Sequence, residues 1–293
     1  MKSVYKIMFV FSMVLTASAV ILLAVFGLRF GIDFKGGSLL EIVFNESRPS
    51  ADTLTETLNS ISGVQNASVN PSGERIMLVR LNDIDEETHQ SIMAQISEEF
   101  GAISENRFDS IGPVIGNELR SKSIKAIIIL ILAVMAYIAW VFRKMSRVLS
   151  PWAMGLAAVI ALIHDVIIPV GIFALLGHYY GIEITAVFVA AALTILGYSL
   201  ADSVVVFDRV RENVLRLGNS QNFGELVHKS IMQTLTRSLN TTFTTLLALI
   251  AIYLFGGDSI KYFALALIIG IFSGAYSSIF VASPILVWWG RKK

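Results

Sequence analysis

The sequence contains no cysteine and carries few charged residues. Without cysteine, the chain forms no disulfide bond, holds no thiolate-bound metal and has no cysteine nucleophile. The absence of cysteine does not indicate whether the protein works in a reducing or an oxidising compartment. Asp, Glu, Lys and Arg make up 15% of the 293 residues, against about a quarter in an ordinary soluble domain. The net charge of +1 gives no indication of a nucleic-acid partner. The scarcity of charge argues against a soluble protein.

Hydrophobic residues, at 55% of the chain, gather in long blocks. A helix that crosses a hydrocarbon layer of about 30 Å needs about 20 residues, whereas a soluble core spreads its apolar residues in shorter periodic runs. Six blocks are long enough to span a membrane: residues 7–28, 124–142, 152–176, 183–207, 239–255 and 260–289. The last block is too long for one straight span, so part of it is expected to tilt or to lie in the interface. The pattern predicts a polytopic α-helical membrane protein with six transmembrane helices.

The positions of lysine and arginine predict the orientation, because cytoplasmic loops are enriched in these residues. If every block crosses once, the basic residues of both ends and of two loops fall on one side: Lys2, Lys6, Arg143, Lys144, Arg147, Arg209, Arg211, Arg216, Lys229, Arg237, Arg291, Lys292 and Lys293. We therefore expect both termini to be cytoplasmic. A cleavage-like triplet lies at residues 17–19, but the apolar run continues to residue 28, which favours an uncleaved anchor over a removable signal.

A long polar segment, residues 29–122, separates the first two spans, and the charge rule places it outside the cytoplasm. Alternation and turn residues predict strands at 38–44, 64–69, 76–81 and 102–111, a turn at 70–73, and helices at 51–61 and 85–100. The order βαββαβ is typical of a ferredoxin-like α+β domain. The predicted organisation is transmembrane helix 1 (1–28), this extracytoplasmic domain (29–122) and a five-helix transmembrane bundle (123–293) with a cytoplasmic loop at 207–238.

Asp165 is an ionisable residue deep in the third predicted span, roughly 20 Å along the helix from Trp152. Burying such a group costs several kcal/mol unless it is paired or hydrated, so it is a candidate functional residue. Pro169 lies four residues later and removes the helical donor for the Asp165 carbonyl, which predicts a polar notch and a hinge. The alternative is a structural hydrogen bond from Asp165 to a neighbouring helix.

Asp202 is a second intramembrane carboxylate, roughly 8 Å short of the cytoplasmic edge marked by Asp208. Arg237 opens the fifth span at a comparable depth, and a carboxylate and a guanidinium at matched depth can form a bidentate pair. Arg237 also belongs to a polar stripe with threonines at 241, 244 and 245, which is expected to face the bundle. If water reaches Asp202 from alternate sides, protonation would release the arginine and couple proton passage to helix movement. The alternatives are a static salt bridge or an arginine that extends to lipid headgroups.

Other patterns carry less functional information. The segment 207–238 has apolar residues at helical spacing and predicts an amphipathic helix on the membrane surface or against the bundle: Phe223, Leu226, Val227, Ile231 and Leu235. Gly270 and Gly274 predict close helix packing in the last span. His164 adjoins Asp165 but has no second histidine at ligand spacing, and no glycine-rich loop followed by lysine suggests a nucleotide site. We therefore expect neither an enzyme nor a bound cofactor.

Four stretches, distributed in order over nearly the whole chain, resemble the conserved motifs of the SecF proteins of the SecD/SecF family. Gly-Ile-Asp-Phe-Lys-Gly-Gly at 31–37 follows the first span and includes Gly31, Asp33, Gly36 and Gly37. The stretches at 111–116 and 277–284 match the approach to the second span and the last span. The most specific, residues 197–213, runs from Gly-Tyr-Ser-Leu-Ala-Asp through Asp208, Arg209 and Arg211. A glycine motif alone reflects turn chemistry, but the combination is specific.

The resemblance implies half of a resistance-nodulation-division type bundle in the bacterial inner membrane. It implies SecD as a partner, association with the Sec translocon channel, contact with the translocating polypeptide, and use of the proton-motive force to assist export. Asp202 and Arg237 match the residues associated with proton coupling in the family, and Asp165 matches its His-Asp stretch. Ala201 departs from the usual asparagine, which removes one polar neighbour of Asp202.

Two other functions are compatible with the same helices. A proton-driven exporter half for lipid or small molecules would share the carboxylates, although exporters usually carry two bundle halves, and the 31–37 motif argues against this assignment. A passive scaffold of the Sec complex would transduce no energy. It predicts that a neutral hydrogen-bonding pair can replace Asp202 and Arg237 without loss of function.

Overall fold

A computed structural model describes residues 3–65, 67–145, 149–217 and 222–290. Five basic residues used to predict the orientation lie outside these ranges: Lys2, Arg147, Arg291, Lys292 and Lys293. The chain divides into two compact units, residues 30–124 and residues 1–29 together with 125–293.

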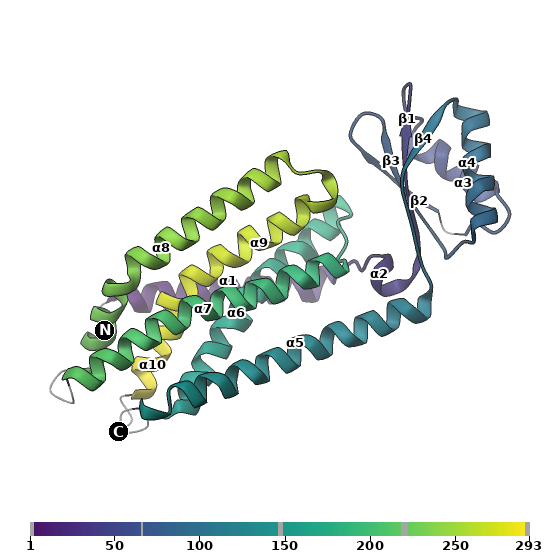
Figure 1. Cartoon of the computed structure of the whole chain (residues 1–293). Helices are drawn as coiled ribbons and strands as arrows, with labels where there is room; N and C mark the ends of the chain where they lie inside the picture. Colours follow the sequence, from purple (N-terminus) through teal and green to yellow (C-terminus); the bar gives the residue numbers. More distant parts are fainter. Residues whose placement is uncertain (1–2, 66, 146–148, 218–221, 291–293) are drawn as a thin grey trace. The chain divides into compact units, whose positions relative to one another are not determined.

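The unit 30–124 contains a four-stranded antiparallel sheet with the strand order β2-β3-β1-β4. The elements follow one another as α2 (Ile32–Lys35), β1 (Gly37–Phe44), α3 (Ala51–Ser60), β2 (Ser68–Ser72), β3 (Ile76–Leu81), α4 (Glu86–Phe100) and β4 (Ile103–Ile111). Figure 1 shows α3 and α4 on the same side of the sheet. Both helices therefore share one core with one face of the strands.

That core follows from period-two alternation in the two central strands. Alternate residues of β1 (Leu40, Ile42, Phe44) and of β3 (Met77, Val79, Leu81) are buried. The helices complete the core with pairs at helical spacing, Leu54 and Leu58 of α3 and Ile92 and Ile96 of α4, all 0% exposed. One apolar face of the sheet is thus covered by one apolar stripe from each helix.

The prediction of a turn at residues 70–73 was wrong, because β2 continues through Pro71 to Ser72 and the turn is formed by residues 73–75. The predicted strand 64–69 also begins too early, since β2 starts at Ser68. Proline lacks an N–H donor, but β2 is an edge strand, where that donor needs no partner strand. Gly73 occupies the left-handed region at φ +78° and allows the tight reversal.

The helices α3 and α4 each begin at a side-chain cap. The Ser50 hydroxyl accepts a hydrogen bond from the Thr53 amide at 3.1 Å, and the Asp85 carboxylate accepts one from the Thr88 amide at 2.9 Å. The Thr88 backbone N–H stabilises the ionised form, so the pKa of Asp85 lies below its usual value. These caps fix where α3 and α4 start.

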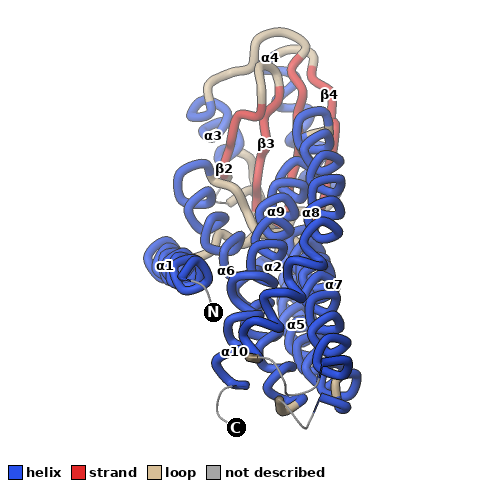
Figure 2. Tube along the Cα trace, turned by 90° about the vertical axis from the view of Figure 1, so that its left-hand side faces the viewer, coloured by secondary structure: helices blue, strands red, loops and turns tan. Residues whose placement is uncertain are grey.

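Six helical segments are long and apolar enough to cross a membrane. They are α1 (Ser3–Phe26), α5 (Pro113–Val141), α6 (Pro151–Tyr180), α7 (Ala186–Leu217), α8 (Phe223–Phe255) and the final segment that begins with α9 (Asp258–Ser277), and a 3₁₀ turn, Arg143–Met145, follows α5. The helix α9 contacts α6, α7 and α8 (Figure 2). The described parts of the predicted surface segment 207–238 continue α7 and α8 as unbroken helix rather than forming a separate helix.

The final segment is divided rather than continuous. A π-helical stretch, Ser278–Ala282, follows α9, and α10 (Ser283–Gly290) completes the chain's described part. Pro284 lacks the N–H that the Phe280 carbonyl would receive in a regular helix, which explains the irregular winding. Within this stretch the Ser283 hydroxyl donates to the Ser278 carbonyl at 2.7 Å. By contrast, α6 runs through Pro169 without a break, so the expected hinge does not interrupt this helix.

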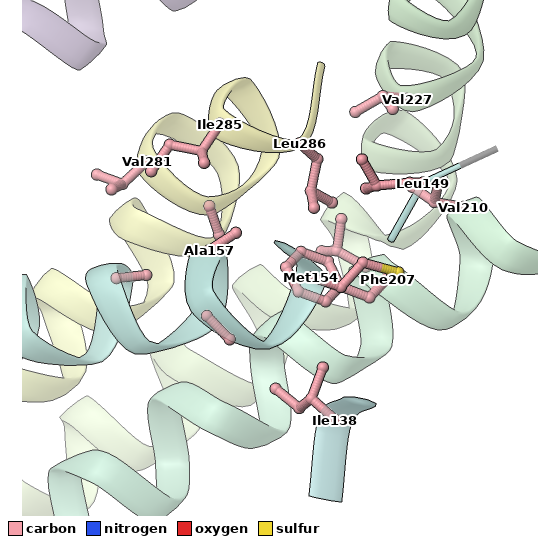
Figure 3. Close-up of a cluster of buried hydrophobic side chains, with 14 of the residues drawn as sticks. Ile138, Leu149, Met154, Ala157, Phe207, Val210, Val227, Val281, Ile285 and Leu286 are labelled. Carbon is pink, nitrogen blue, oxygen red and sulfur yellow. The ribbon is translucent and has the colours of Figure 1, made fainter. Parts of the chain in front are cut away.

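The helices of this unit pack through a mixed apolar cluster and through close backbone contacts. Figure 3 shows Phe207 of α7 beside Met154 of α6, with Ile138 of α5 and Leu286 of α10 around them. Gly270 and Gly274 of α9 face α7, as their spacing predicted: the space beside Gly270 is filled by Ile195, and a Cβ on Gly274 would lie 3.0 Å from the Ser199 Cβ. Small residues therefore let α9 approach α7.

The first helix, α1, docks along a narrow seam. Its buried residues are Tyr5, Ser12 and Ala19, which recur every seven residues. Opposite Ala19 lies Gly171 of α6, where a Cβ would stand 2.6 Å from the Ala19 Cα, Cβ and carbonyl oxygen. The remaining apolar side chains of α1 are largely exposed, as expected for a helix that faces lipid.

Candidate functional site

The carboxylate of Asp202 lies on α7 at the meeting point of three helical segments. The Ser238 hydroxyl of α8 donates to Asp202 Oδ1 at 2.5 Å. The Ser278 hydroxyl, at the start of the π-helical stretch, donates to Asp202 Oδ2. Asp202 is partly buried, and each carboxylate oxygen receives a hydroxyl donor from a different neighbouring segment. A change in its charge would therefore act on both segments at once.

Arg237 does not form the expected pair with Asp202. Among the residues that the structure describes, Arg237 makes no ion pair with this carboxylate, and Ser238, the next residue, takes that place. Both Asp202 and Arg237 instead line a cavity of about 120 Å³, together with Tyr198, Ala201, Val205, Ser238 and Thr241. Arg237 therefore lies beside the same cavity as the Asp202 carboxylate but makes no ion pair with it.

The polar stripe that follows Arg237 is mostly on the outside of the helices, which corrects the expectation that it faces the bundle. Thr241 and Thr244 are exposed, and each hydroxyl donates to a carbonyl four residues earlier in its own helix. Thr245 is half-buried and donates to the Thr241 carbonyl in the same way, but its hydroxyl also accepts a long 3.5 Å hydrogen bond from Tyr198. Threonine can satisfy its hydroxyl within its own helix, so its presence does not require an inward face.

A second cavity, of about 420 Å³, adjoins the first. Asp208, Arg209 and Glu212 of α7 and Gln233 and Thr234 of α8 line it, and Val205 and Arg237 are common to both cavities. Polar side chains therefore continue from the Asp202 cavity toward the end of α7. The two cavities thus share part of their polar lining.

Asp165 is fully buried on α6 and is surrounded by donors. His164 Nδ1 lies 2.8 Å from Asp165 Oδ1, while the hydroxyls of Ser199 (α7) and Ser277 (α9) donate to Oδ2 at 2.5 and 2.7 Å. The sequence identified the carboxylate, and the alternative of a hydrogen bond to a neighbouring helix is confirmed, but the two partner serines were not predicted. Serines at 199, 277 and 278 are polar residues inside predicted spans, and Ser238 directly precedes the fifth predicted span; that was the signal that could have found them.

The family-motif glycines near the start of the sheet unit serve close backbone approach. Gly36 and Gly37 have φ values of +79° and +118°, which other residues rarely adopt. A Cβ on Gly36 would stand 2.7 Å from the Pro113 Cα, and one on Gly37 would stand 2.6 Å from the Leu81 carbonyl oxygen. Gly116 approaches the Gly36 amide in the same way. The stretches 31–37 and 111–116 thus pack directly against each other.

The charged motif residues at the end of α7 pair with one another along the helix. Arg211 lies 2.9 Å from Asp208, and Arg209 pairs with Glu212. Exposed pairs of this kind stabilise a protein by about 1 kcal/mol or less. Asp33 lies in α2, and Gly31 precedes that helix, so these two motif residues belong to the other unit.

Comparison with known proteins identifies the family. Residues 92–292 match the model for the protein export membrane protein SecD/SecF, C-terminal, and residues 21–47 match the SecD/SecF GG motif. A SecF protein of Thermobaculum terrenum is 42% identical, over 97% of this chain and 92% of its own length. A SecDF protein of Brucella abortus is 35% identical, and this chain covers 36% of it.

A solved structure has the same fold. The crystal structure of SecDF from Thermus thermophilus, described as a translocon-associated membrane protein, matches with a TM-score of 0.85 and 33% identity over 98% of this chain. This chain spans 38% of that SecDF chain. Since one family model covers more than half of the sequence, the chain belongs to the SecD/SecF family of protein export membrane proteins, on its SecF side.

Proposed function

We propose that this chain is an accessory subunit of the Sec translocase that works with SecD and uses the proton-motive force to assist protein export. SecF relatives at 32–42% identity over most of the chain support the Sec assignment. The fused SecDF relatives support SecD as the partner, because one polypeptide there carries both names. Six apolar helices support a multi-pass inner-membrane protein.

The observation that carries proton coupling is the setting of Asp202. A carboxylate inside a span is costly unless donors or water surround it, and Asp202 has both a pair of hydroxyl donors and a polar cavity. When Asp202 is ionised, Ser238 and Ser278 hold it from two segments. When it binds a proton, one oxygen turns from acceptor into donor, so the contacts between α7, α8 and the π-helical stretch must change.

Arg237 supplies the charge that responds to this change. Its guanidinium lines the cavity of Asp202 and adjoins the larger polar cavity. A shift of the guanidinium toward an ionised Asp202, and away from a protonated one, would convert proton binding into relative movement of α7 and α8. In this proposal Asp202 carries the proton, Arg237 senses its charge, and Asp165 acts as a further proton-coupling residue.

The partner surface follows from the exposed polar stripe. Arg237, Thr241 and Thr244 lie at the surface of helices that would otherwise meet lipid. Polar groups in spans normally face protein or water, so this stripe favours cover by another subunit. We propose that SecD supplies it, completing a resistance-nodulation-division type bundle from two halves. The Sec channel and the lipid membrane are the other expected neighbours.

The sheet unit is proposed to be the extracytoplasmic, ferredoxin-like domain that meets the translocating polypeptide. Its element order β1-α3-β2-β3-α4-β4 and its strand order support that fold. The basic loops support cytoplasmic termini. Protons are the only coupling species proposed, with no cofactor and no enzymatic reaction.

Export of a secreted reporter tests the proposal in cells that depend on this chain and its SecD. Asp202→Asn keeps the size of the side chain and offers one acceptor and one donor, like the protonated carboxyl group, but it cannot release a proton. We expect it to assemble with SecD and to lose export, whereas Glu225→Gln, an exposed carboxylate at the start of α8 outside both cavities, retains export. A passive scaffold is favoured by the complete hydrogen bonding of Asp202, and it predicts normal export by Asp202→Asn.

A further inference from the structure

Ser277 and Ser278 are consecutive residues that donate to different intramembrane carboxylates. Ser277 donates to Asp165 of α6 at 2.7 Å, and Ser278 donates to Asp202 of α7. Successive residues of a helix point about 100° apart, so two neighbours can reach two flanking helices. One dipeptide thus bridges the two carboxylates.

Each bridging hydroxyl has a second acceptor within reach. Ser277 Oγ lies 3.2 Å from the Gly274 carbonyl, and Ser278 Oγ lies 3.1 Å from the Ala275 carbonyl. A serine hydroxyl has one hydrogen to donate. It can therefore serve the carboxylate while that group is ionised and turn to the carbonyl when the carboxylate carries its own proton.

His164 gives Asp165 a site for proton exchange. The imidazole is buried, and its Nε2 has no hydrogen-bond partner in the described part of the chain. A proton can pass from Asp165 Oδ1 to His164 Nδ1 across 2.8 Å, breaking the O–H bond and forming an N–H bond. The pair stays neutral as a whole in both forms, which suits a fully buried site.

The other titratable groups that face this pair, within the described helices packed against α6, are few. The ring of Tyr276 of α9 stacks on the ring of His164, with 6.5 Å between the ring centroids. The Tyr276 hydroxyl donates to the Met8 carbonyl at 2.5 Å. Asp202 of α7 is linked to Asp165 through Ser277 and Ser278. On α1, Tyr5 is engaged with His228 of α8. Arg237 of α8 lines the cavity beside Asp202, and this cavity is its link to the His164–Asp165 pair.

We propose that His164 and Asp165 form a second proton-binding site, and that Ser277 and Ser278 link its hydrogen bonding to that of Asp202. A proton gained at Asp202 releases the Ser278 hydroxyl, which lies where α9 gives way to the π-helical stretch. The local rearrangement reaches Ser277, the adjacent residue, and changes the donor set of Asp165. This inference deepens the proposed function and rests on Asp202 as its proton carrier.

Infrared difference spectroscopy between acidic and alkaline buffer tests the link, using the full chain with SecD in lipid nanodiscs. Protonated carboxyl groups give C=O bands whose frequency reports their hydrogen bonding. We expect Asp165→Asn to remove one band and Asp202→Asn to shift that same band. In a Ser277→Ala background the shift should be lost, and Ser273→Ala, a buried serine one turn earlier, should leave it intact.

Two results would overturn the inference. One is the absence of any band that depends on Asp165, since the pair would then hold no exchangeable proton. The other is an Asp165 band that Asp202→Asn does not shift, or that shifts equally after Ser277→Ala. Ser278→Ala removes the other contact of the bridge, the hydrogen bond to Asp202, and replaces Ser277→Ala in this test if Ser277→Ala fails to fold. Loss of the bridge leaves the export result for Asp202→Asn unchanged, so failure of this inference and failure of the proposed function are distinguishable.

Discussion

Replacing Gly171 with alanine should loosen the docking of α1. A Cβ at this position would lie 2.6 Å from three atoms of Ala19, two of which belong to the backbone of α1. Carbon atoms in contact prefer about 3.5–4.0 Å. The two helices must therefore separate by roughly 1 Å at this point, because backbone atoms cannot rotate away as a side chain can.

The cost of this clash falls on α1. Only three described residues of α1 are buried, whereas α6 is held by buried residues along most of its length. Overpacking by one methyl group typically costs about 1–3 kcal/mol, so Gly171→Ala should destabilise the helix pair by about that amount. Ala19→Gly should restore little of the loss, since the Ala19 Cα and carbonyl oxygen remain in the way.

Thermal unfolding in detergent measures the effect, and at about 2–4 °C per kcal/mol the expected decrease in Tm is several degrees. Gly197→Ala is the matched control, because it makes the same substitution in a spanning helix with nothing within 4 Å of the new Cβ. Alanine favours a helix over glycine, so the control should be neutral or slightly stabilising. Equal Tm values for wild type and Gly171→Ala would refute the close contact between α1 and α6.

Three further predictions concern single side chains. Leu58→Ala, at a fully buried position of the sheet unit, should cost about 2–5 kcal/mol, measured by chemical denaturation. The cap of Asp85 on Thr88 contributes stability above an unfolded pKa of about 3.9 that is lost as pH falls through the lower folded pKa. The protection factor of the Thr88 amide in hydrogen exchange should therefore fall in acid, and Asp85→Asn should remove this pH dependence. Ser238→Ala removes a donor to Asp202, a bond to a charged group worth about 1.5–3 kcal/mol, and should reduce export while assembly with SecD persists.

Hydropathy located the spans because each apolar run had to be buried in lipid, but it did not locate the helix ends. The helix α5 begins at Pro113 and α8 at Phe223, well before the apolar blocks at 124 and 239. Helical hydrogen bonding continues through polar residues, so the edge of the hydrophobic run marks the membrane rather than the helix. The turn at Pro71 was wrongly predicted because a strand tolerates proline when it lies at the edge of the sheet. The position of β2 at the edge is known only from the folded structure.

The carboxylates of the site could be predicted from the sequence, and their partners could not. Placing an aspartate inside a span costs free energy whichever way its side chain points, so the sequence alone identifies Asp165 and Asp202 as candidate functional residues. The depth of Arg237 suggested a pair with Asp202, but depth leaves the rotation of α8 open, and that rotation presents Ser238 to the carboxylate instead. From the sequence alone, Ser277 and Ser278 are interpreted as small residues that favour close helix packing, because the sequence does not show which helices lie beside α9. Their contacts depend on α6 and α7 flanking the same helical segment, so that a 100° turn between adjacent residues lets one serine donate to Asp165 and the next to Asp202.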